Sequence, residues 1–261
     1  MGILNVTPDS FSDGDRYYSV DAALARARTM EEEGAVIIDV GGESTRPGAE
    51  SVDESVEIAR VVPVIQGIDA SSEVAISIDT SKPKVMAAAV AAGACIVNDI
   101  RALRAPVARS WAAVAEVGVC LMHMQGEPRT MQHNPHYGDV VLEVCEFLMR
   151  ERDACIQAGI AREAIALDPG LGFGKTLEHN LTLLKELARI AALGAPLLVG
   201  VSRKSFIGKI LGKTVDERLY GGLGLAALAV VNGARIIRTH DVAATRDAIG
   251  MVSAALQGIE H

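Results

Sequence analysis

The sequence is poor in aromatic residues, which make up 3% of its 261 residues, and it carries a net charge of −8. An acidic protein lacks the broad basic surface that nucleic-acid-binding proteins use, so we expect no nucleic-acid partner. The four cysteines form no CxxC pair, which favours reduced thiols in a cytoplasmic protein. No apolar run is long enough to span a bilayer, and the N-terminus lacks the basic and apolar parts of a secretory signal.

What the sequence has in abundance is small and branched aliphatic residues. It is 49% hydrophobic and 22% charged, which is typical of a globular protein. Short β-branched runs alternate with longer stretches rich in Ala, Leu and Glu. The expected strands are 2–7, 35–42, 74–80, 95–100, 119–124, 164–170, 196–202 and 234–240. Nearly continuous apolar strands indicate a parallel sheet, so we predict one domain over residues 1–261, a single (β/α)8 barrel.

Polar residues gather at the C-terminal ends of these predicted strands. They are Asn5, Asp39, Asp79, Asn98, Asp99, His123, Asp168, Ser202, Lys204, Arg238 and His240. Any one of them taken alone is equally well explained as a helix cap or a loop hydrogen bonder. The same asymmetry in every strand favours an active site, because the loops of a barrel converge at that end.

Two cations close neighbouring predicted strands. Lys204 and Arg238 are expected beside Asp168, which makes this the best local site for a phosphate or pyrophosphate in an acidic protein. Ser202 and Lys204 share a side if the strand continues that far, and Arg203 then faces the other way.

Two loops are long and irregular, at 5–17 and 41–50, which is typical of mobile functional loops. The stretch "GLGFGK" at 170–175 is only a weak match to a nucleotide-binding loop, and we interpret it as a flexible βα turn. No catalytic triad and no zinc-binding spacing occur.

Eight ordered motifs resemble the dihydropteroate synthase family of bacterial folate biosynthesis over about residues 1–250. They are "MGILNVTPDSFSDG", "DVGGESTRPGA", "SIDTSKP", "VNDIRAL", "LMHMQGEP", "LDPGLGFGK", "LLVGVSRKS" and "RTHDV". The resemblance implies that 6-hydroxymethyl-7,8-dihydropterin pyrophosphate and p-aminobenzoate condense to 7,8-dihydropteroate and pyrophosphate. Sulfonamides, which mimic p-aminobenzoate, then compete for its site.

The resemblance also implies roles for individual residues. The pterin is held by Asp79, Asn98, Met122, Asp168, Gly172, Phe173, Gly200, Lys204 and Arg238. The p-aminobenzoate site is built from Phe11, Thr45, Arg46, Pro47, Ser202 and Lys204, with the two loops closing after the pterin binds. Pyrophosphate is held by Asn5, Thr45, Arg238 and His240, with Mg²⁺ coordinated through Asn5 and phosphate oxygens. Asp79, Lys204 and Arg238 are the expected catalytic residues.

The family is homodimeric through helices late in the barrel, so a homodimer is expected. Its members carry an N-terminal extension ahead of the first strand, whereas Met1 here lies at the start of that strand. Without a lead-in, the first strand is expected to fray.

Three other functions remain open. A methyltetrahydrofolate-binding domain of a corrinoid methyltransferase shares the pterin anchors but does not need the "STRPG" loop or Lys204. An aldolase-type barrel uses Lys204 as a Schiff base, against which Asp168 argues by keeping the lysine charged. A pterin-binding protein without catalysis has the same motifs.

Overall fold

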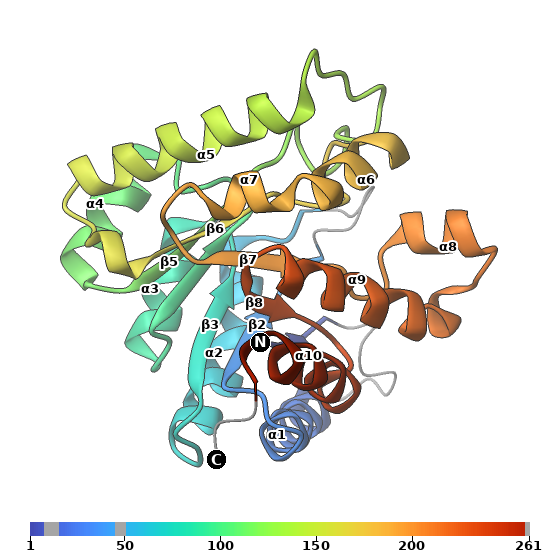
Figure 1. Ribbon diagram of the computed structural model, residues 1–261. Coiled ribbons are helices and arrows are strands. Elements are labelled where there is room, and N and C mark those ends of the chain that lie inside the picture. Colours follow the sequence, from blue (N-terminus) through green and yellow to red (C-terminus); the bar gives the residue numbers. More distant parts are fainter. Residues whose placement is uncertain (8–15, 45–50, 259–261) are drawn as a thin grey trace.

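Eight parallel strands follow one another in chain order around a barrel in the computed structural model, which describes residues 1–7, 16–44 and 51–258. The strands are β1 (Gly2–Asn5), β2 (Ile37–Gly41), β3 (Ala75–Asp79), β4 (Ile96–Asp99), β5 (Gly118–Met122), β6 (Ile165–Asp168), β7 (Leu197–Gly200) and β8 (Ala234–Arg238). The predicted fold class is confirmed, and Figure 1 shows the strands at the centre of a ring of helices.

The barrel closes between β1 and β8. Ile3 N donates to Thr239 O (2.9 Å), and Thr239 N donates to Met1 O (3.0 Å). Residues 2–5 also pair in register with β2 along their whole length. The first strand is therefore hydrogen-bonded on both edges, and the expected fraying has no counterpart in its pairing.

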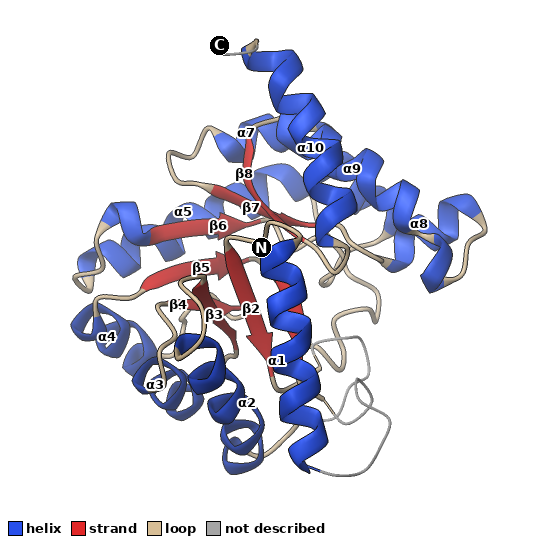
Figure 2. Cartoon of the chain, turned by 90° about the horizontal axis from the view of Figure 1, so that it is seen from below, coloured by secondary structure: helices blue, strands red, loops and turns tan. Residues whose placement is uncertain are grey.

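Helices follow the strands and surround the sheet (Figure 2). They are α1 (Arg16–Glu32), α2 (Glu54–Asp69), α3 (Pro83–Ala91), α4 (Pro106–Ala115), α5 (Val140–Gln157), α6 (Leu177–Lys185), α7 (Leu187–Ala191), α8 (Ser205–Leu211), α9 (Leu219–Val231) and α10 (Val242–Gln257). Several helix starts have a clear local cause. Pro83 occupies the first turn of α3, where its missing N–H costs nothing, and Asp139 Oδ1 accepts from the N–H groups of Val141 and Leu142 at the start of α5.

The main apolar core lies between the barrel wall and the helices. Alternate strand residues such as Ile38, Val40, Ile76 and Ile78 belong to this core. The residues between them point into the barrel, and near the C-terminal ends many of these are polar. Side chains that alternate along each strand therefore give the barrel an apolar outer face and a charged interior.

Two expected boundaries are wrong. The strand predicted at 196–202 ends at Gly200, so Ser202 and Lys204 lie in the turn before α8. The stretch 176–194, expected as one helix, forms two helices that break at Glu186, where neither glycine nor proline signals the break. Among the described residues no helix is long and apolar enough to cross a membrane.

Candidate active site

A buried ionic network spans the barrel interior at the C-terminal ends of the strands. Arg238 Nε donates to Asp39 Oδ2 (2.6 Å) and its Nη2 donates to Asp79 Oδ2 (2.8 Å). Asn98 Nδ2 donates to the same Asp39 oxygen at 3.1 Å. Strands β2, β3, β4 and β8 are therefore linked by one guanidinium, two carboxylates and one amide.

In this network two carboxylates share one guanidinium. The side chain of Asp39 is fully buried and that of Asp79 is 9% exposed, and in each carboxylate Oδ1 has no hydrogen-bond partner. Burial raises the pKa of Asp79 to about 7; Arg238 acts in the opposite direction, and the charge of Asp39 adds to the rise. Asp79 thus changes its protonation state near neutral pH.

A second group of polar side chains faces this network from β6 and the turn after β7. Asp168 Oδ1 accepts from Gly170 N (2.7 Å). Burial raises the pKa of Asp168, against the opposing effects of that hydrogen bond and of the Lys204 charge. Burial likewise lowers the pKa of Lys204 to about 8, although Asp168 raises it. Asp168, Lys204 and Arg238 thus form the expected site of mixed charge, but burial lowers the pKa of Lys204 by more than Asp168 raises it.

An apolar wall borders the charged floor. Met122, Met124, Met131 and Ile100 form a small cluster separate from the main core, with Phe173 packed against it. The ammonium of Lys204 lies 4.4 Å from the centroid of the Phe173 ring, a cation–π contact.

The turn that carries Phe173 is tightly held, contrary to the expected flexible turn. A Cβ on Gly170 would lie 1.9 Å from His123 O, so only glycine fits there. Lys175, at the end of the turn, is 3% exposed and inserts its ammonium beneath it. Sequence reasoning assigned no role to Lys175 or Asp39. The signal for Asp39 was a carboxylate inside the apolar strand "IIDVG", which needs a buried partner.

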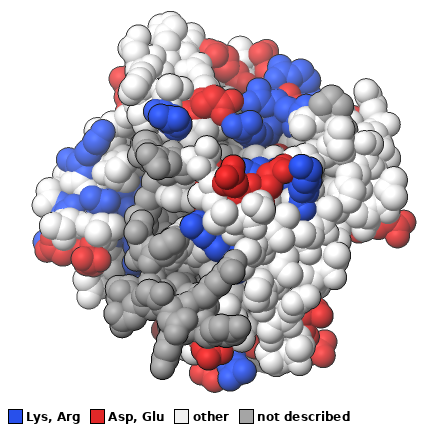
Figure 3. Space-filling model, turned by 180° about the vertical axis from the view of Figure 1, so that it is seen from behind, with Lys and Arg blue, Asp and Glu red and all other residues white. Residues whose placement is uncertain are grey.

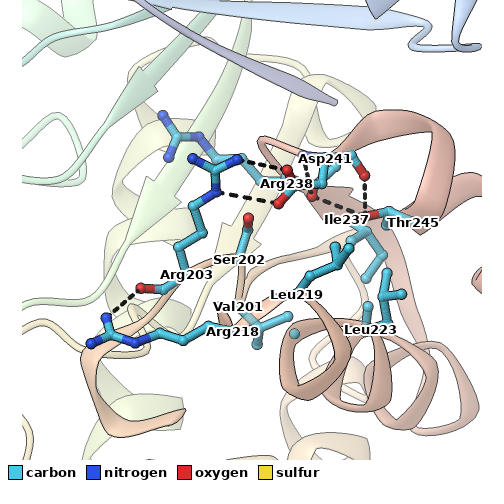
Figure 4. Close-up of a pocket in the computed structure, with 13 residues that line it drawn as sticks. Val201, Ser202, Arg203, Arg218, Leu219, Leu223, Ile237, Arg238, Asp241 and Thr245 are labelled. Carbon is cyan, nitrogen blue, oxygen red and sulfur yellow. Dashed lines mark hydrogen bonds and ion pairs between the residues drawn. The ribbon is translucent and has the colours of Figure 1, made fainter. Parts of the chain in front are cut away.

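The hydroxyl of Ser202 is hydrogen-bonded to His240. Its Oγ lies 2.9 Å from His240 Nδ1 and accepts from His240 N (3.2 Å). Ser202 lines a small pocket between the ends of β7 and β8 and the helices α9 and α10 (Figure 4). Arg203 lines the same pocket, and its half-exposed guanidinium pairs with Asp241 (2.6 Å), just before α10.

The oxygen atoms near β1 suit a metal that is shared with a ligand. An ideal Cβ on Gly41 would lie 3.7 Å from Asn5 Oδ1 and 3.8 Å from Asp79 Oδ2, so both oxygens flank this glycine. Within the described part of the chain no group of three or more His, Cys, Asp and Glu side chains is arranged to hold a metal ion. Amide and carboxylate oxygens that leave most coordination positions to substrate and water are the donors Mg²⁺ accepts.

Residues that the sequence singled out are thus brought to one end of the barrel. Asn5, Asp79, Asn98, Met122 and Asp168 end strands β1, β3, β4, β5 and β6, or come next to last. Gly172, Phe173, Gly200, Ser202, Lys204, Arg238 and His240 lie in or directly after the last three strands. Phe11, Thr45, Arg46 and Pro47 lie outside the described residues.

On the face in Figure 3, basic and acidic side chains lie next to one another in the part drawn in colour.

Comparisons with known proteins agree with this geometry. A family described as pterin binding enzyme matches residues 1–240. The dihydropteroate synthase of Escherichia coli K12 is 52% identical over 261 residues, covering 100% of this chain and 93% of that protein.

Solved structures of dihydropteroate synthases superpose closely. The Yersinia pestis enzyme in a sulfonamide drug complex has a TM-score of 0.94 and 47% identity, covering 99% of this chain and 94% of that one. The Xanthomonas albilineans enzyme with 4-aminobenzoic acid has a TM-score of 0.93 and 47% identity, covering 100% and 93%. With its fold, its buried charged site and these relatives, the chain belongs to the dihydropteroate synthase family of pterin-binding enzymes.

Proposed function

We propose that the chain condenses 6-hydroxymethyl-7,8-dihydropterin pyrophosphate with p-aminobenzoate, giving 7,8-dihydropteroate and pyrophosphate. The observation that carries the proposal is the cluster of buried Asp79, Asn98 and Asp168 with half-buried Lys204 and Arg238 at the C-terminal end of the barrel. Its carboxylates can accept hydrogen bonds from the N–H groups along one edge of the pterin ring, and its cations can pair with the oxygens of a pyrophosphate. The relatives solved with 4-aminobenzoic acid and with 7,8-dihydropteroate are in keeping with these substrates.

Asp168 is the proposed anchor of the pterin. One of its oxygens is occupied by Gly170 N, and the carboxylate still has acceptor capacity for the 2-amino and N3 hydrogens of the ring. Asn98 and Asp79 complete this edge. The amide nitrogen of Asn98 is engaged by Asp39, which leaves its oxygen for the ligand.

The flat ring then occupies a slot beside Met122, Phe173, Gly172 and Gly200. Glycine is favoured at 172 because its φ is +85°, a conformation that residues with a side chain rarely adopt, and a Cβ there would also come within 3.3 Å of Lys204 Cδ. Lys204, held against the face of Phe173, donates to the carbonyl side of the pterin.

The leaving group is proposed to bind Asn5, Arg238 and His240. Arg238 uses Nε and Nη2 for the two aspartates, so Nη1 provides donors for a phosphate oxygen. Asn5 is the protein oxygen that fits Mg²⁺, which when bound neutralises charge on the pyrophosphate. The pairing of Ser202 with His240 orients that imidazole.

The chemistry needs no protein nucleophile. Departure of pyrophosphate breaks the carbon–oxygen bond and leaves a methylene cation that the pterin ring delocalises. The ionised carboxylate of Asp79 stabilises that cation, and the amine of p-aminobenzoate attacks it and then loses a proton. The protein contributes orientation and electrostatic stabilisation.

The p-aminobenzoate site rests on the family resemblance. Phe11, Thr45, Arg46 and Pro47 are proposed to build it with Lys204. Ser202 is a weaker candidate than expected, because its hydroxyl is hydrogen-bonded to His240.

The test is pyrophosphate release by the purified protein. With Mg²⁺ and the dihydropterin pyrophosphate present, release is expected to depend on p-aminobenzoate, to be inhibited competitively by a sulfonamide and to fall when Mg²⁺ is chelated. A folded protein that binds the pterin but releases nothing would favour the binding-protein or methyltransferase function. Trapping by borohydride with a carbonyl substrate would favour the aldolase.

The rate is expected to rise with pH through neutrality. Because the pKa of Asp79 is raised to about 7, its ionised and cation-stabilising form grows as the pH passes that value. With saturating Mg²⁺, kcat/KM for the pterin substrate should increase between about pH 6 and pH 8. In Asp39→Asn the step should move to lower pH, because the negative charge that raises the pKa of Asp79 is gone. A wild-type profile that is flat in this window contradicts the role of Asp79.

The protein is also proposed to form a homodimer through its late helices. Leu228 and Val231 on α9 and Met251 on α10 are exposed apolar side chains, and these two helices pack together. Light scattering is expected to give twice the 27.4 kDa chain mass, and Val231→Asp should shift the mass towards one chain. A wild-type monomer at micromolar concentration would refute the dimer.

A further inference from the structure

We propose that Lys175 is a positioning residue of the pterin subsite: its buried ammonium holds the turn 170–175 in the shape that presents Gly172 and Phe173 to the ring. The inference rests on the proposed function, since it assigns the turn to pterin binding. It adds a residue that acts through its neighbours and does not contact substrate.

The ammonium is surrounded by acceptors that belong to two segments of the chain. Its Nζ lies 2.9 Å from His123 Nδ1, 3.0 Å from Gly170 O, 3.0 Å from Phe173 O and 3.3 Å from His123 O. Three N–H groups thus serve four acceptors. Lys175 therefore joins the end of β5 to both ends of the turn that follows β6.

The imidazole partner is set up to accept. While Lys175 is protonated its ammonium has no lone pair, so His123 Nδ1 is then the acceptor in this contact. Burial and the charge of Lys175 lower the pKa of His123 to about 2, which keeps the ring neutral. Phe147 packs against the same ring edge-on at 4.8 Å.

The turn depends on these bonds because it has no strand or helix to satisfy its backbone. Gly170, Gly172 and Gly174 all have positive φ, so their carbonyls point in directions that no regular ladder serves. Gln132 and Tyr137 donate to the carbonyls of Gly172 and Gly174. Lys175 donates to Gly170 O and Phe173 O. Gly170 O also accepts from Phe173 N (3.0 Å), so the loss of Lys175 falls mainly on Phe173 O, the carbonyl of the residue that faces the ring.

A shift of this turn reaches the proposed pterin site directly. Phe173 contacts both the methionine cluster and the ammonium of Lys204. Displacing a positioning group by about 1 Å can cost an enzyme as much as a hundredfold in rate. Loss of Lys175 is therefore expected to weaken pterin binding more than p-aminobenzoate binding.

Burying an ammonium costs free energy, so a residue that only filled space would not need to be a lysine. Burial lowers the pKa of Lys175 to about 7, with Asp168 acting in the opposite direction. Methionine has a similar length without the charge or the donors, so it isolates the hydrogen bonds from the packing.

The experiment compares Lys175→Met with Lys185→Met, a change at an exposed lysine on α6. Dissociation constants for the dihydropterin pyrophosphate are measured by calorimetry well below each melting temperature, and KM for p-aminobenzoate at saturating pterin. Lys175→Met is expected to raise the pterin constant about tenfold and to change KM for p-aminobenzoate less than about twofold. Lys185→Met should match the wild type.

Unchanged pterin affinity in Lys175→Met, whatever its melting temperature, would overturn the inference by reducing the residue to a structural role. If that variant does not fold, Tyr137→Phe, which removes only the bond to Gly174 O, decides: a threefold or larger loss of pterin affinity supports the inference, and an unchanged value refutes it. A folded wild-type protein that binds no pterin instead overturns the proposed function.

Discussion

Asparagine in place of Asp168 is expected to weaken binding of the dihydropterin pyrophosphate by roughly a hundredfold or more. The carboxylate is proposed to accept two parallel hydrogen bonds from the pterin. Asparagine keeps the shape and can keep the bond from Gly170 N, but it turns an NH₂ group towards the donors of the ring. kcat/KM should fall in proportion, because the anchor acts in the ground state and in the transition state alike.

The same substitution should leave the fold intact or stabilise it. Burial raises the pKa of Asp168, which means that the native protein keeps a carboxylate where it is poorly solvated. A neutral amide avoids that cost. Calorimetric titration with the pterin and a thermal melt make the comparison, with Asp153→Asn on the exposed face of α5 as the control. Asp168→Asn that binds the pterin within a few-fold of wild type would remove Asp168 from the proposed anchor.

Methionine in place of Arg238 is expected to lower the free energy of unfolding by about 3–5 kcal/mol, because it leaves buried charges unpaired. Asp39 and Asp79 both rely on this guanidinium, and each already has one oxygen without a partner. Activity should also be lost, since the same side chain is proposed to hold the pyrophosphate. Urea denaturation gives the stability, and Arg203→Met is the matched control. Its exposed ion pair with Asp241 is worth less than about 1 kcal/mol.

The loss of stability in Arg238→Met, measured as the free energy of unfolding relative to wild type, should depend on pH in a defined direction. Arg238 lowers the pKa of Asp79, so its removal raises that pKa further above the ordinary value of 3.8. A folded pKa above the unfolded one contributes stability that is present at low pH and is lost as the pH rises. Below about pH 7 Asp79 is largely protonated in both folded proteins, so this part of the deficit should be absent there and should grow as the pH rises above 7. A deficit that is independent of pH, or one no larger than that of Arg203→Met, would contradict the proposed balance of the network.

The barrel itself could be predicted from local patterns. Eight apolar runs alternate with helical stretches, and each run carries its polar residues at the same end. Because the carboxyl ends of parallel strands meet at one edge, this asymmetry alone predicted that Asp79, Asn98, Asp168 and Arg238 would lie together. The two cations Lys204 and Arg238 indicated an anionic ligand, and the eight ordered motifs indicated the family.

Three features of the site were decided only by tertiary structure. Arg238 and Asp39 are 199 positions apart and meet because the barrel closes, so no local pattern reveals that the guanidinium is already shared. Ser202 and Lys204 were expected to share a side if the strand continued that far, but the strand ends at Gly200 and Ser202 turns to His240. Lys175 closes a turn that the sequence predicted to be flexible. It is buried because carbonyls and a neutral imidazole from a neighbouring strand converge on it, and such three-dimensional complementarity is set by packing rather than by sequence spacing.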